Sequence, residues 1–210
     1  MKKYLLLILY FASATYSLAQ DQLGIKVAPS LSFSSIHTNP DTTGFSSGGV
    51  ALRLKLGVIY DYDLAIKDSY YLSMGLLFAA KQASIKNNTA SIKEQYELQY
   101  LQVPLLLKLY TSEVSLDTRL YVELGATGEL KINDRATKLE DKPRAFRLWG
   151  LSGLIGFGVE YSTSLFTSVF AGISYQRGLT SMLEKEYDAN SVSQVLGYAN
   201  FVGLDVGIKF

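Results

Sequence analysis

Very few side chains in this sequence of 210 residues have the types and spacing that catalysis or metal binding requires. Cysteine is absent and His37 is the single histidine, so neither a thiolate nucleophile nor a zinc site built on Cys and His ligands is available. His37 could pair with Asp41 or Glu140 as a base and its orienting carboxylate, but no nucleophile accompanies them in a recognisable arrangement. The sequence therefore predicts that the protein is not an enzyme, with no catalytic residue, no metal ion and no cofactor.

Charged side chains form a second group with chemical potential. They recur at alternate positions within apolar segments, so that basic and acidic residues fall on the same face of their segments. Because both signs are present, we expect these residues to pair with one another inside the protein. The expected network, to which Lys209 also belongs, consists of Lys26, Arg53, Lys55, Lys81, Lys108, Glu123, Glu129, Lys131, Glu160 and Asp205.

The alternation itself identifies the elements that hold these charges. Between Leu23 and Phe33, apolar residues occupy odd positions and small or polar residues even ones, which is the period of a β-strand with two different faces. Pro29 lies on the apolar face and cannot donate a ladder hydrogen bond, so we expect a bulge or a local defect in pairing there. The same pattern predicts eight strands, over residues 23–33, 49–58, 71–81, 96–110, 120–131, 149–160, 169–175 and 197–210.

The connections between these strands alternate in length. Short ones contain residues 61–63, 111–113 and 162–163, and longer polar ones lie near residues 37–47, 84–95, 133–147 and 178–194. Transmembrane barrels have short periplasmic turns and longer outer loops, and a chain of eight strands with both ends in the periplasm has three turns and four loops. The sequence therefore predicts an all-β fold, a single antiparallel up-and-down transmembrane β-barrel. Ten strands is the alternative.

Two features favour a membrane barrel over a soluble one. The apolar faces are long and nearly unbroken, whereas the opposite faces are rich in Gly, Ala, Ser and charge, which suits a lipid-facing exterior and a narrow polar interior. An eight-stranded barrel is only wide enough for side chains to fill, so the charged residues are expected to form a plug rather than a conducting path. Aromatic residues gather towards the strand ends, as at two bilayer interfaces; this set includes Tyr60, Tyr110, Trp149, Tyr161, Tyr175 and Tyr198.

The N-terminus has the features of an export signal. Lys2 and Lys3 precede an apolar run that is too short to span a bilayer, and Ser17 and Ala19 stand where a signal peptidase requires small residues. We expect cleavage after Ala19, leaving residues 20–210 as one outer-membrane domain. The last residue, Phe210, resembles the terminal signal that bacterial outer-membrane barrels present to their insertion machinery.

Several segments together resemble the PorT-like family of outer-membrane β-barrel domains found in Bacteroidetes. The resemblance covers nearly the whole mature length and rests on residues 23–28, 100–108, 121–125 and 203–210. It implies a bacterial outer-membrane location with lipid as a partner. It also implies a role in protein secretion or envelope assembly, with proteins of those systems as partners, because the namesake takes part in type IX secretion.

Composition and charge narrow the remaining functions. The 20 basic and 19 acidic residues are scattered without a Lys/Arg run, so nucleic acid is not an expected partner. Three functions stay open at this point. They are a non-enzymatic component of secretion or envelope assembly, a narrow solute channel, and a soluble lipocalin-like barrel for apolar ligands, of which the sequence favours the first.

Overall fold

The computed structural model describes residues 21–39, 45–47, 49–64, 69–87, 92–138, 146–182 and 194–210. Within them, alternating sequence produces long antiparallel strands. Their bounds are β1 Gln22–Asn39, β2 Phe45–Ser47, β3 Val50–Asp63, β4 Tyr70–Asn87, β5 Ile92–Tyr110, β6 Thr118–Lys138, β7 Trp149–Ser164, β8 Thr167–Gly178 and β9 Gln194–Lys209. The predicted signal peptide, residues 1–19, lies outside the described residues.

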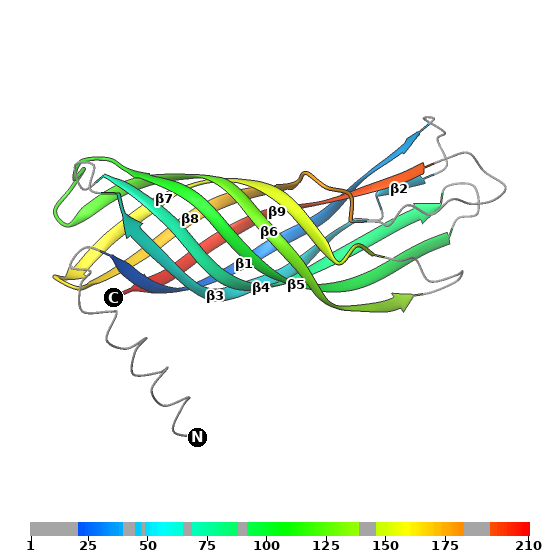
Figure 1. Ribbon diagram of the computed structural model, residues 1–210, viewed down its shortest axis with the longest axis horizontal. Coiled ribbons are helices and arrows are strands. Elements are labelled where there is room, and N and C mark those ends of the chain that lie inside the picture. Colours follow the sequence, from blue (N-terminus) through cyan, green and yellow to red (C-terminus); the bar gives the residue numbers. More distant parts are fainter. Residues whose placement is uncertain are drawn as a thin grey trace, which may run out of the picture.

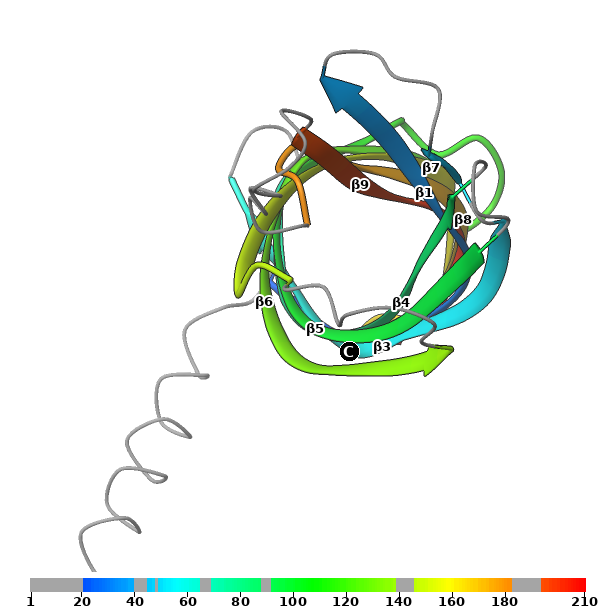
Figure 2. The ribbon, with the colours of Figure 1, turned by 90° about the vertical axis from the view of Figure 1, so that its right-hand side faces the viewer.

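The strands close into a barrel (Figures 1 and 2). Each long strand pairs antiparallel with its neighbours along the chain, β1 pairs with β9, and β4 pairs with both β3 and β5. The short β2 pairs with the long-loop end of β4, beyond the part of β4 that pairs with β3. It is therefore not counted as a separate strand of the barrel wall. The barrel therefore has eight strands, as predicted, and the ten-stranded alternative is wrong. At the short-turn end, paired hydrogen bonds join the backbones of Leu23 and Phe210 at 2.8 and 3.2 Å.

The apolar faces point outward. Leu52 is 72% exposed and Phe157 is 61% exposed, and the outward residues of all eight barrel strands are of the same kind. The buried residues are those on the opposite faces, which point into the barrel. Many of them are charged. This orientation excludes the lipocalin-like alternative, since such a barrel turns its apolar face inward. None of the described residues forms a helix long and apolar enough to cross a membrane.

Two of the three predicted short turns are misplaced. Residues 61–63 belong to β3, and residues 162–163 belong to β7, whose hairpin with β8 turns instead at Leu165 and Phe166. Both predictions treated polar residues as turn residues, but at the barrel rim polar residues on the inner face continue the strand and its ladder. The third turn does contain residues 111–113.

Six strands also run farther toward the long-loop end than predicted, and β1, β4, β5 and β6 do so by the greatest lengths. Backbone pairing continues to Asn39 in β1, to Asn87 and Ile92 across the β4–β5 hairpin, and to Lys138 in β6. These segments are polar because they extend beyond a stretch of about 9–11 residues, which is what a tilted strand needs to cross a bilayer.

Two prolines mark local breaks in the ladder. Pairing of β1 with β9 passes from Val27 directly to Ser30, omitting Pro29, as expected from its missing N–H. Pairing of β4 with β5 is interrupted in the same way beside Pro104. Each proline keeps its pairing with the strand on its other side.

Candidate functional site

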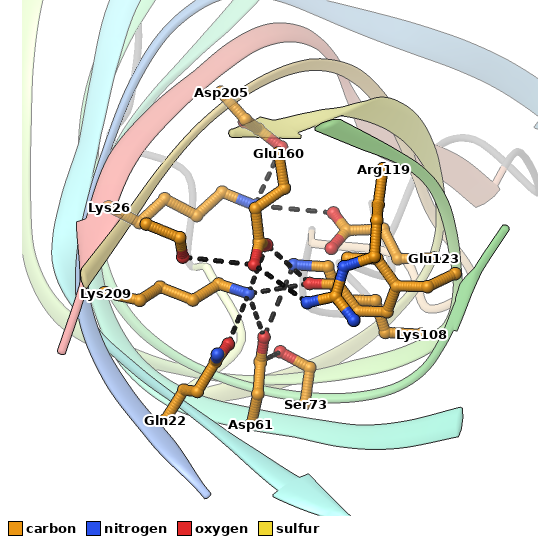
Figure 3. A network of polar contacts seen from close by, with 12 residues as sticks. Gln22, Lys26, Asp61, Ser73, Lys108, Arg119, Glu123, Glu160, Asp205 and Lys209 are labelled. Carbon is orange, nitrogen blue, oxygen red and sulfur yellow. Dashed lines mark hydrogen bonds and ion pairs between the residues drawn. The ribbon is translucent and has the colours of Figure 1, made fainter. Parts of the chain in front are cut away.

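The densest polar cluster lies inside the barrel near the short turns (Figure 3). The ammonium group of Lys209, from β9, lies 2.6 Å from Asp61 Oδ2 and 2.6 Å from Glu160 Oε2, and it donates to the hydroxyl of Tyr110 at 2.7 Å. Tyr110 in turn donates to Glu160 at 2.6 Å, and Lys108 lies 3.4 Å from Asp61. These five residues, called the short-turn cluster below, come from β3, β5, β7 and β9, so they tie strands from around the barrel together.

A second group occupies the middle of the barrel. Lys26 lies 2.7 Å from Asp205 and 3.4 Å from Glu123, which places one ammonium group between two buried carboxylates. Lys55 donates to the side-chain oxygen of Gln176 at 3.3 Å, and its ammonium group lies 5.2 Å from the centre of the Phe201 ring.

A third group lies nearer the long loops. Glu129 lies at its centre. Lys81 lies 2.5 Å from one carboxylate oxygen of Glu129, and the side-chain amides of Gln102 and Gln176 donate to the other oxygen at 2.8 and 3.0 Å. Ser152 also donates to Glu129 at 3.1 Å. A buried carboxylate requires several donors, and this one has four.

The three groups are balanced in charge. Their side chains are at most 9% exposed, and five ammonium groups face five carboxylates. The two sets are Lys26, Lys55, Lys81, Lys108 and Lys209, and Asp61, Glu123, Glu129, Glu160 and Asp205. Buried charges are costly unless opposite charges lie nearby, and the equal numbers leave these ten side chains without a net charge.

The walls of the barrel differ in the size of their inner side chains. Strands β7, β8 and β9 present several glycines on their inner faces, and the large side chain of Tyr121, from the adjacent strand β6, packs over Gly158 and Gly172. A Cβ atom at Gly158 or at Gly172 would lie 2.5 Å from the hydroxyl oxygen of Tyr121, on β6. The ring of Tyr121 also lies 4.1 Å from the Lys108 ammonium, measured to the ring centre, in a cation–π contact between the neighbouring strands β5 and β6.

A cavity of about 20 Å³ lies in the middle of the barrel, and its lining includes Lys26, Lys55, Gln102, Thr127 and Gln176. Such a volume accommodates about one water molecule.

The comparisons with known proteins agree with this geometry. Residues 18–184 match the family model described as "Outer membrane protein beta-barrel domain". The chain belongs to this family. No curated protein matches the sequence.

Solved outer-membrane proteins share the fold of this barrel domain. The outer membrane protein OprG from Pseudomonas aeruginosa is 16% identical, with a TM-score of 0.54, and the match covers 90% of this chain and 95% of OprG. Neisserial surface protein A is 12% identical, with a TM-score of 0.51, and the match covers 91% and 97% of the two chains. The family and these structures place the protein in the bacterial outer membrane.

Most residues of the expected charge network lie in these three groups, but two do not. Arg53 lies 3.0 Å from Glu97, and Lys131 lies 2.6 Å from Asp134, both in partly exposed pairs towards the long-loop end. The prediction also missed Asp61, which was assigned to a turn although it follows Lys55 at even spacing on the inward face of β3.

The aromatic residues expected at the bilayer interfaces divide into two sets. Trp149, Tyr161 and Tyr175 are exposed on the outer surface of this outer-membrane barrel, and Tyr60 and Tyr198 are partly exposed. Tyr110 was predicted to be among them, and that prediction is wrong. It is 7% exposed and bonded to Glu160 within the lumen, because it shares the inward face of β5 with Lys108.

Over the described residues, no group of three or more His, Asp or Glu side chains is arranged to hold a metal ion. Asp41 and Glu140 lie outside the described residues, as does the side chain of His37.

Proposed function

We propose that this protein is a non-enzymatic integral outer-membrane component that acts through its surfaces, serving protein secretion or envelope assembly as the PorT-like resemblance implies. One observation carries the proposal, namely that the lumen is filled by paired charges from all sides. Because the interior of such a barrel is occupied, its loops and turns are the parts that can contact partners.

Displacing the paired charges that fill the lumen would cost too much free energy for ordinary solute passage. Opening a path past Lys209 would separate it from Asp61 and Glu160, both within 2.6 Å. Leaving one member of a buried ion pair without its partner costs about 3–5 kcal/mol. Two further groups of charges lie along the same lumen, at Lys26 and at Glu129, so a permeating molecule would meet this obstacle repeatedly.

Site-directed cross-linking in the native outer membrane tests the proposed role. The chain has no cysteine, so a single introduced cysteine gives a unique attachment point. Ser112→Cys places a photoreactive group at the short-turn end, and Gln99→Cys places one near the long loops, both at exposed positions. Leu204→Cys, on the outward apolar face, is the matched control for contact with lipid alone.

The outcomes separate the candidate functions. Recovery of secretion or assembly proteins in stoichiometric amounts from one rim position, and not from Leu204→Cys, would support the proposal and locate the contact. Recovery of the barrel alone from all three positions would contradict it. A barrel with a structural role, or a narrow solute channel, would then remain as the candidate functions.

A further inference from the structure

The most exposed apolar side chains among the described residues gather at the short-turn end. Leu165 is 95% exposed and Phe166 is 82% exposed at the β7–β8 turn, and Leu116 is 82% exposed in the β5–β6 turn. Val114, in the same turn as Leu116, is 56% exposed. These four residues are called the apolar rim below.

The two turns of the apolar rim lie on the same side of the barrel. The backbone carbonyl of Asp117, in the β5–β6 turn, accepts a hydrogen bond from the backbone N–H of Ser162, near the end of β7, at 2.8 Å. Directly beside them, Tyr161 is exposed on the outward face of β7, opposite Thr118. The apolar rim is therefore continuous with the lipid-facing surface of the wall.

Turn geometry does not account for these residue types. The β7–β8 turn has two residues between the paired Ser164 and Thr167, a position where Gly, Asn and Asp are favoured over Leu and Phe. In the β5–β6 turn the left-handed position, with φ of 55°, is taken by Asp117, so Leu116 has no conformational task. The surroundings of the turns must therefore account for the apolar side chains.

We propose that the apolar rim is embedded in the lipid leaflet at the short-turn end, so that these two turns are bilayer contacts rather than solvated loops. The length of β8, the shortest barrel strand, agrees with this position. From Phe166 to Tyr175 the chain rises about 23 Å, at about 3.3 Å per residue and a tilt of about 40°, close to the apolar band of about 25 Å in such barrels. With Tyr175 at one interface, Phe166 reaches the other.

The sector of the same end near β1 and β3 contains hydrogen bonds to an acidic side chain. Asp21 accepts hydrogen bonds from the hydroxyl of Tyr60 at 2.6 Å and from the backbone of Asp63 at 2.9 Å.

Fluorescence of single-tryptophan variants tests this seating. Trp149 is the only tryptophan, so Trp149→Phe gives a silent background. In that background, Phe166→Trp and Leu116→Trp report on the apolar rim, and Ser112→Trp is the matched control at an exposed polar position of the same turn as Leu116. Each variant is refolded into phosphatidylcholine vesicles, and its folding is checked by heat-dependent migration on a gel.

The expected result is a blue-shifted emission for Phe166→Trp and Leu116→Trp, with strong quenching by lipids brominated near the headgroup and weak quenching by aqueous acrylamide. Ser112→Trp should show the reverse. The proposal is overturned if both rim variants emit and quench like Ser112→Trp. Shielding from acrylamide that occurs only in native envelopes, and not in pure lipid vesicles, would indicate a protein partner and would also overturn it.

Discussion

Replacing Lys209 by methionine removes the charge that holds the short-turn cluster together. The ammonium group lies 2.6 Å from both Asp61 and Glu160, and all three side chains are 1% exposed. After Lys209→Met, two carboxylates stay buried with only Lys108 at 3.4 Å and Arg119 at 3.8 Å to offset them. Methionine keeps much of the volume, so the loss is electrostatic.

The expected cost follows from the environment of these charges. Removing one partner of a buried ion pair costs about 3–5 kcal/mol, because the remaining charge is shielded from solvent and has lost its nearest counterion. Lys131→Met is the matched control, since its pair with Asp134 is partly exposed and such pairs contribute less than about 1 kcal/mol. Combining Asp61→Asn with Lys209→Met should recover part of the loss, with a coupling energy of about 0.5–3 kcal/mol.

Urea unfolding of the refolded proteins in lipid vesicles measures these differences in free energy. The reasoning is refuted if Lys209→Met and Lys131→Met lose the same small amount of stability. It is also refuted if the double variant shows no coupling, because the two side chains would then not act as a pair.

Three further predictions concern the wall and its assembly. Phe157→Arg, on the outward face, should cost about 2–4 kcal/mol of folding free energy in vesicles near the bilayer midplane; an unchanged stability would mean that this face does not contact lipid. Gly158→Ala should destabilise the barrel by about 1–3 kcal/mol, because the new methyl group would collide with Tyr121. Gly153→Ala, where the nearest atom is 3.9 Å away, should be nearly neutral, and equal effects in urea unfolding would contradict the packing. Phe210→Ala should lower the amount of folded barrel in cells while leaving refolding in vesicles unchanged, and normal cellular levels on a heat-shift gel would exclude an assembly signal there.

The faces of the strands could be predicted from sequence because the bilayer imposes a strict alternation. The same alternation also gives the correct face for two residues that the prediction misassigned. Asp61 lies six residues after Lys55, and Tyr110 lies two residues after Lys108, so even spacing alone places both inside the barrel. Asp61 was misassigned because two aspartates close together are typical of a turn. Tyr110 was misassigned because a tyrosine near a strand end is typical of a bilayer interface.

The pairing of the charges could not be predicted in this way. Alternation places Lys26 and Glu123 on inward faces, but their contact at 3.4 Å joins residues 97 positions apart. Which carboxylate meets which lysine depends on the register of every intervening strand and on the shear of the barrel. The apolar turn at Leu165 and Phe166 was missed because turns are recognised from polar and glycine-rich sequence.

The central claim, a lumen closed by paired charges, is tested most directly by single-channel recording in planar bilayers. The wild-type protein is compared with a variant in which Lys108, Tyr121 and Lys209 are all replaced by serine, which removes three large side chains buried in the lumen at its short-turn end. No stable conductance is expected for the wild type, and measurable conductance is expected for the folded variant. A stable, wide conductance of the wild-type barrel would contradict it.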